Sequence, residues 1–167
     1  MVRVSIVTLV IGAPPSPSVV VLRPTSEEHP SDLALPIWIG PNEAAAIGIA
    51  LEDQPSARPL THDLLVSAIH ALDAQIDRIL IDHVEGSTFF ATVVLAHDKK
   101  TLRLDARPSD SIALAVRTGA PLFVSEEILN TVALPYRGSF DRQNENDIKE
   151  FREFLESVKP EDFTSQD

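Results

Sequence analysis

The chain of 167 residues contains no cysteine. This absence excludes disulfide bonds, thiolate nucleophiles and cysteine-based zinc sites, and it is typical of a protein from a reducing compartment. The sequence also lacks an apolar run long enough to span a bilayer. Its short apolar start is interrupted by Ser5 and Thr8, so we interpret it as a strand rather than a signal peptide. We therefore expect a cytoplasmic protein that makes no membrane contact.

Basic residues are also scarce. The chain has 14 Lys and Arg residues against 25 Asp and Glu residues, which gives a formal net charge of −11. Proteins that bind nucleic acid usually meet the phosphates with clustered Lys and Arg side chains. Any binding of DNA or RNA should therefore be weak, and it would need a local group of arginines or bridging metal ions.

Several common catalytic motifs are missing. The sequence has no Gly-rich phosphate loop ending in Lys and Ser or Thr, no G-x-G-x-x-G, no H-E-x-x-H and no G-x-S-x-G. These absences exclude the usual signatures of nucleotide-binding proteins, zinc metalloproteases and serine hydrolases.

The hydrophobic pattern predicts a mixed α/β (α+β) domain over residues 1–137, with helices packed on a mixed sheet. At 44% hydrophobic and 23% charged residues, the chain can bury a core. Residues 138–167 form an acidic tail, in which Ile148, Phe151, Leu155 and Val158 mark one face of an amphipathic helix. Strands are expected at Val2–Ile11, Val19–Leu22, Leu35–Ile39, Gln75–Val84, Thr88–His97, Leu102–Leu104 and Pro121–Val124. Helices are expected at Ala44–Leu51, from Thr61 to Leu72, at Pro108–Arg117 and after Ser125.

One segment resembles another within the chain. Ile39–Ile49 and Ala106–Val116 both read as a strand end, a proline, a small polar residue, an acid and an alanine-rich helix. Proline suits the first helical turn, and an acid there meets the positive end of the helix dipole. A duplicated β-α unit and the general similarity of helix starts both explain the pattern.

Three polar clusters each lie next to a proline and a helix start: Gly40–Glu43, Arg58–Asp63 and Asp105–Asp110. Carboxylates with an imidazole can hold Mg²⁺ or Mn²⁺, which activates water for phosphodiester cleavage. Arginines beside them can hold the phosphate. A structural interpretation is also open and is favoured for any single residue: Thr61, Asn42 and Ser109 as helix caps, with the acids contacting helix dipoles or arginines.

The same clusters carry a resemblance to a known family. Leu35–Gly40 followed by Glu43, then Arg58–Leu64, then Asp105–Ala115 resemble the signature of the bifunctional nuclease domain, and Pro121–Val124 resembles its closing strand. The similarity runs from about Val2 to Val132. It implies a small mixed α/β domain that forms homo-oligomers and acts on DNA and RNA. Many relatives carry a short helical module of the kind found in excision-repair nucleases. The acidic tail of this chain has no clear match to that module.

Two functional hypotheses follow. In the first, the chain is a metal-dependent nuclease, a hydrolase with DNase and RNase activity. In the second, it is a non-catalytic interaction or regulatory domain whose polar motifs are structural latches. For the nuclease, the candidate catalytic residues are His62, Asp63, Asp105 and Asp110, with His62 as general base or ligand. The metal ligands would be Glu43, Asp63, Asp105 and Asp110, and the substrate would bind Arg58, Arg107, Thr61 and Ser109.

Overall fold

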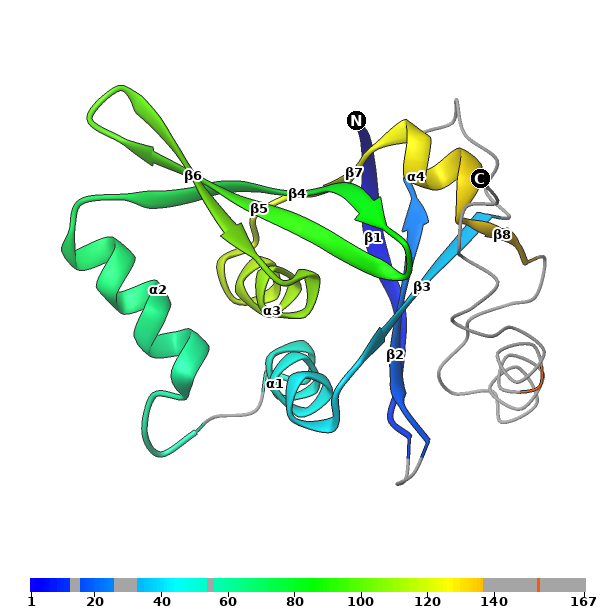
Figure 1. The fold of residues 1–167 in the computed structure, drawn as a ribbon. Coiled ribbons are helices and arrows are strands. Elements are labelled where there is room, and N and C mark those ends of the chain that lie inside the picture. The colour runs from blue at the N-terminus through cyan, green and yellow to red at the C-terminus, as the bar shows by residue number, and fades with distance from the viewer. Residues whose placement is uncertain (13–15, 26–32, 54–55, 137–152, 154–167) are drawn as a thin grey trace.

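A computed structural model of the chain describes residues 1–12, 16–25, 33–53, 56–136 and 153. Within this part of the chain, the strands form one mixed sheet in the order β6-β5-β4-β7-β1-β2-β3-β8. Helices pack on the sheet, and strands β4, β5 and β6 arch over helix α3 (Figure 1). The predicted mixed fold class is confirmed.

The first part of the chain is an antiparallel meander followed by a helix. It contains β1 (Val2–Val10), β2 (Ser18–Pro24), β3 (Leu33–Ile39) and α1 (Pro41–Leu51). β-Branched residues favour strands β1 and β2, which pair as the predicted hairpin. Pro36 lies in β3, whose outer side pairs with β8 only at Leu33 and Ala34 in the described residues. A proline is tolerated there because it interrupts no ladder on that side.

The middle of the chain repeats this arrangement. It contains β4 (Gln75–Glu85), β5 (Thr88–His97), β6 (Lys100–Ala106) and α3 (Pro108–Thr118). The β4–β5 turn includes Gly86 with φ of 59°, a conformation that glycine adopts without strain. Strand β5 has a neighbour on both sides, which fits its apolar pattern, although it is second from the edge of the sheet.

The two parts are therefore equivalent β-β-β-α units. In the sheet they run in opposite orders, β6-β5-β4 and β1-β2-β3, on either side of β7. Helices α1 and α3 each contain 11 residues, begin with a proline and follow an extended N-cap residue, Gly40 or Arg107. The similarity seen in the sequence thus extends to a whole repeated unit, which favours duplication over coincidence.

The remaining elements join or flank these units. Strand β7 (Leu122–Val124) pairs parallel with β4 and antiparallel with β1, over three residues on each side. Helix α4 (Glu126–Thr131) is capped by Ser125, as predicted, because its Oγ accepts from the backbone N–H of Ile128 at 3.2 Å. Strand β8 (Leu134–Pro135) follows.

The N-cap of helix α2 (Thr61–Ala71) is not the predicted residue. Thr61 is its first helical residue, and the N-cap is Leu60, whose N–H is bonded by Asp63 Oδ2 at 2.7 Å. The interpretation of Thr61 as a cap is wrong for this reason. Asn42 and Ser109 are not caps either, since the N-cap positions of their helices are Gly40 and Arg107.

The apolar stripe of α2 is only partly covered. Ile69 is buried in the core, whereas Leu64, Leu65 and Leu72 are 64%, 43% and 71% exposed. A 3.6-residue period shows that apolar residues share a face, but it does not show that a neighbour covers that face.

The main core lies between the sheet and helices α1 and α3. It includes Leu22, Leu35, Ile47, Ile81 and Ile112, all fully buried. None of the described helices combines the length and apolar character needed to cross a bilayer. The predicted amphipathic helix of the tail lies, apart from Glu153, outside the described residues.

Candidate functional site

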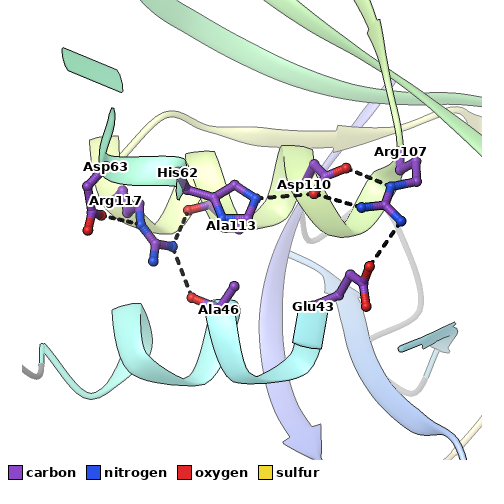
Figure 2. A network of polar contacts seen from close by, with 8 residues as sticks. All are labelled: Glu43, Ala46, His62, Asp63, Arg107, Asp110, Ala113 and Arg117. Atoms are coloured by element: carbon purple, nitrogen blue, oxygen red, sulfur yellow. Dashed lines mark hydrogen bonds and ion pairs between the residues drawn. The ribbon is translucent and has the colours of Figure 1, made fainter. Parts of the chain in front are cut away.

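The N-terminal ends of α1 and α3 bring two carboxylates to one guanidinium group (Figure 2). Arg107 donates from Nε to Asp110 Oδ2 at 2.7 Å and from Nη2 to Asp110 Oδ1 at 3.2 Å. Its Nη1 donates to Glu43 Oε1 at 3.0 Å. Two of the three sequence clusters, which are 64 residues apart at these positions, therefore meet in space.

The repeated units explain this convergence. Glu43 and Asp110 are both the third residue of their helix, two positions after the proline, where the helix dipole favours an acid. Glycine at the N-cap of α1 leaves room for the Glu43 carboxylate, because a Cβ at Gly40 would lie 2.3 Å from Glu43 Oε2. The equivalent N-cap in α3 carries the arginine. One unit thus supplies a carboxylate, and the other supplies a carboxylate and a cation.

His62 supports this cluster from the first turn of α2. Its Nε2 lies 3.2 Å from Asp110 Oδ1, and its side chain is only 14% exposed. Burial raises the pKa of Asp110, but the hydrogen bonds of Arg107 and His62 outweigh that effect and hold it below its usual value. The Asp110 carboxylate in turn raises the pKa of Arg107. Asp110 is therefore an anion held between two partners.

Asp63, the neighbour of His62, belongs to a second ion pair at the other end of α3. Its Oδ1 accepts from Arg117 Nε at 2.6 Å. Arg117 Nη1 also donates to the carbonyl oxygens of Ala46 and Ala113, both at 3.0 Å. The backbone N–H of Leu60, followed by Arg117, lowers the pKa of Asp63. Arg117 is 8% exposed and joins α1, α2 and α3, so this pair is a structural latch.

A pocket of about 460 Å³ opens beside the first cluster. Glu43, Arg107 and Ser109 line it on the helix side, and Ile37, Ile39 and Phe89 line it on the sheet side. Arg107 is 65% exposed there, in contrast to the covered Arg117. An exposed guanidinium, whose orientation is fixed by two carboxylates, can bind an incoming anion without reorganisation.

A second pocket of about 420 Å³ lies next to the latch. Arg58, Asp63 and Arg117 line it, together with residues at the C-terminal end of α1. Arg58 is exposed. The two arginines predicted to hold phosphate lie in different pockets, since Arg107 lines the first and Arg58 lines the second.

The other predicted site residues lie apart from the cluster. Asp105 is exposed on β6, directly opposite Thr92 in the ladder with β5. The neighbours of Thr92 on β5, Ala91 and Val93, are core residues, so Thr92 and Asp105 lie on the opposite face of the sheet. Thr61 is exposed. Ser109 is buried to 7% exposure and lines the first pocket.

The residues predicted to hold Mg²⁺ or Mn²⁺ do not fit a preformed site. In the described ranges, no three or more His, Asp or Glu side chains are grouped to hold a metal ion. Glu43 and Asp110 share a cation, but that cation is the Arg107 guanidinium. Asp63 and Asp105 are elsewhere, so a divalent ion stays a prediction that the cleavage assay below tests.

Known proteins resemble this chain over most of its length. A family model described as the bifunctional nuclease domain matches residues 20–137, a range that holds Glu43, His62, Arg107 and Asp110. The chain belongs to the bifunctional nuclease domain family. Two relatives from Mycobacterium tuberculosis, "Uncharacterized protein MT1877" (strain CDC 1551 / Oshkosh) and "Uncharacterized protein Rv1829" (strain ATCC 25618 / H37Rv), are each 36% identical over 168 residues. The alignments cover 98% of this chain and 98% of each relative.

Sequence reasoning missed two parts of this bifunctional nuclease domain. Arg117 carries no signal of its own, because its partner Asp63 is 54 residues away and a basic residue in a last helical turn is common. Phe89 was assigned only to a strand, and the pocket that it lines exists only once β3, β5 and the two helix starts come together.

Proposed function

We propose that this bifunctional nuclease domain binds and hydrolyses phosphodiesters of nucleic acids at the pocket beside Arg107. The observation that carries the proposal is the exposed Arg107 guanidinium, which lines a pocket and is oriented by Asp110 and Glu43. The planar guanidinium can donate two hydrogen bonds to oxygens of a tetrahedral phosphate. The family match supports the same chemistry.

Each polar residue then has a distinct role. Arg107 holds the phosphate, and Asp110 fixes the guanidinium plane through two hydrogen bonds. His62 lies outside the described lining of the pocket, so it acts here as a positioning residue for Asp110. Glu43 is 22% exposed and lines the pocket. Its carboxylate can accept a proton from the attacking water while the bond from phosphorus to the leaving oxygen breaks and that oxygen takes up a proton from solvent.

The second hypothesis, an interaction domain with structural latches, keeps part of its support. The Asp63–Arg117 pair is such a latch, with its arginine covered and its contacts spread over three helices. The two ends of α3 therefore differ in role. For the pocket, the non-catalytic alternative is that it binds a nucleotide without hydrolysing it.

The deciding experiment is cleavage of labelled RNA and of single- and double-stranded DNA, with Mg²⁺, with Mn²⁺ and with EDTA. Glu43→Gln and Arg107→Met are compared with Asp53→Asn, a change at an exposed acid away from the cluster. Loss of cleavage in the first two variants only, with unchanged cooperative melting, supports a nuclease site here. Equal cleavage by all proteins refutes this site. Binding without cleavage by any protein favours the non-catalytic alternative. The EDTA arm tests the predicted metal dependence.

We propose further that two copies pair along β6. In the part of the chain that the structure describes, this edge strand pairs with β5 alone, and Leu102 and Leu104 are 42% and 43% exposed. An antiparallel pairing centred on Leu104 places Arg103 opposite Asp105 of the second copy, and opposite charges in cross-strand pairs are stabilising. This pairing would account for the predicted homo-oligomer. The cytoplasmic location stays a prediction from the lack of cysteine.

A further inference from the structure

The pocket beside Arg107 has two chemically different sides. Ile37, Ile39 and Phe89 form an apolar wall on the sheet side, and Phe89 also packs against the core. The polar side holds Arg107 and Glu43, and Ser87 and Thr88 of the β4–β5 hairpin also line the pocket. A volume of about 460 Å³ lies within the range of small-ligand sites. A ligand that fills it needs both an apolar, planar part and an anionic part.

The charge of the protein excludes a long duplex as the best ligand. Arg107 is the sole cationic side chain among the described residues that line the pocket, and the chain carries a net charge of −11. Duplex binding depends on many phosphate contacts along the backbone, which these residues do not offer. Single strands are bound differently, because each unpaired base can stack on an aromatic ring.

We propose that the pocket binds one unpaired nucleotide, with its base against Phe89 and its phosphate on Arg107. The substrate class of the domain is then single-stranded nucleic acid rather than duplex. This inference rests on the proposed function for the position of the phosphate, and it adds the base-binding wall. The same chemistry is offered by a free nucleoside monophosphate and by a nucleotide within a strand.

The chain provides its own reporter. Trp38 is the single tryptophan of the sequence and belongs to the lining of this pocket between Ile37 and Ile39, so a change in its fluorescence is one test of occupancy. The protein is titrated in EDTA with adenosine 5′-monophosphate, ribose 5-phosphate, a short single-stranded oligonucleotide and the corresponding duplex. Anisotropy of a labelled oligonucleotide gives an independent readout. We expect saturable binding of the monophosphate and of the single strand, and weaker binding of ribose 5-phosphate and of the duplex.

Phe89→Leu removes the ring and keeps an apolar side chain in the wall. Its matched control is Phe90→Leu, because Phe90 is the next residue of β5, points to the other face and stacks on His83 with ring centroids 4.4 Å apart. Phe89→Leu should weaken binding of the single strand by about 5- to 150-fold, the range expected for loss of base stacking. Phe90→Leu should leave it unchanged.

Three outcomes overturn the inference: duplex binding as tight as single-strand binding, equal binding by the two leucine variants, or no binding by either readout. Tight binding of the free monophosphate with no binding of the strand shows that the ligand is a free nucleotide, and it overturns the substrate class. Because binding is measured in EDTA and cleavage is scored separately, an absence of cleavage refutes the proposed hydrolysis without affecting the base pocket.

Discussion

Substitution of Asp63 by asparagine should destabilise the fold even if this aspartate has no part in catalysis. The asparagine keeps an oxygen for the N–H of Leu60, which Asp63 now binds at 2.7 Å, so the change removes mainly the charge that faces Arg117. Hydrogen bonds to charged groups contribute about 1.5–3 kcal/mol. Since the Asp63 side chain is 35% exposed, water replaces part of that interaction, and we expect a loss of about 1–2 kcal/mol.

The measurement is urea denaturation of wild type, Asp63→Asn and a control, Asp53→Asn. Asp53 is exposed and has φ of 49°, which asparagine tolerates equally well, so this control should stay within about 0.5 kcal/mol of wild type. A double-mutant cycle with Arg117→Met should show that Asp63→Asn costs little once Arg117 is absent. If Asp63→Asn and Asp53→Asn are equally stable, the Asp63–Arg117 ion pair does not stabilise the fold and its assignment as a structural latch is wrong.

Three further outcomes are expected. The stability difference between wild type and Asp63→Asn should be complete at pH 7 and should shrink below pH 3.8. The fold lowers the pKa of Asp63, so the stabilisation by its carboxylate is present above the unfolded pKa and is lost when the carboxylate is protonated in the fold. A pH series of urea midpoints checks the direction of this change. Gly40→Ala should displace the Glu43 carboxylate, since the new Cβ would lie 2.3 Å from Oε2, and should lower cleavage while cooperative melting is kept; unchanged cleavage would argue against a role for Glu43. Leu104→Lys should convert an oligomer to monomers in light scattering, whereas Leu72→Lys, at the 71% exposed C-cap residue of α2, should not. Monomeric wild-type protein would exclude the β6 pairing.

The hydrophobic pattern of the chain predicted its elements well because most strands and helices bury one side in a single core. The helix start at Pro108 was recognisable from proline and a nearby acid, which act locally, whereas α1 begins at Pro41, three residues before the predicted start at Ala44. The hairpin at Gly86 was recognisable for the same reason. The cap of α2 was misplaced by one residue, since Asp63 closes the turn from inside the helix.

The site was only partly predictable because its geometry depends on contacts between distant segments. Glu43, Arg107 and Asp110 were singled out, but the sequence did not show that the guanidinium lies between the two carboxylates. His62 and Asp63 are adjacent in the sequence, yet they face opposite ends of α3 (Figure 2). Asp105 was grouped with Asp110 by proximity in sequence, whereas strand alternation directs it to the other face of the sheet.

The short central strand has a mechanical consequence. In the described part of the molecule, the sheets of the two repeated units are joined only through β7, by three residue pairs on each side. The pocket is lined from both units, with Glu43 and Ile39 from the first and Phe89 and Arg107 from the second. The Glu43–Arg107 ion pair and the hydrogen bond from Arg117 to the Ala46 carbonyl also join the two units, so the width of the pocket depends on these contacts between helices as well as on β7.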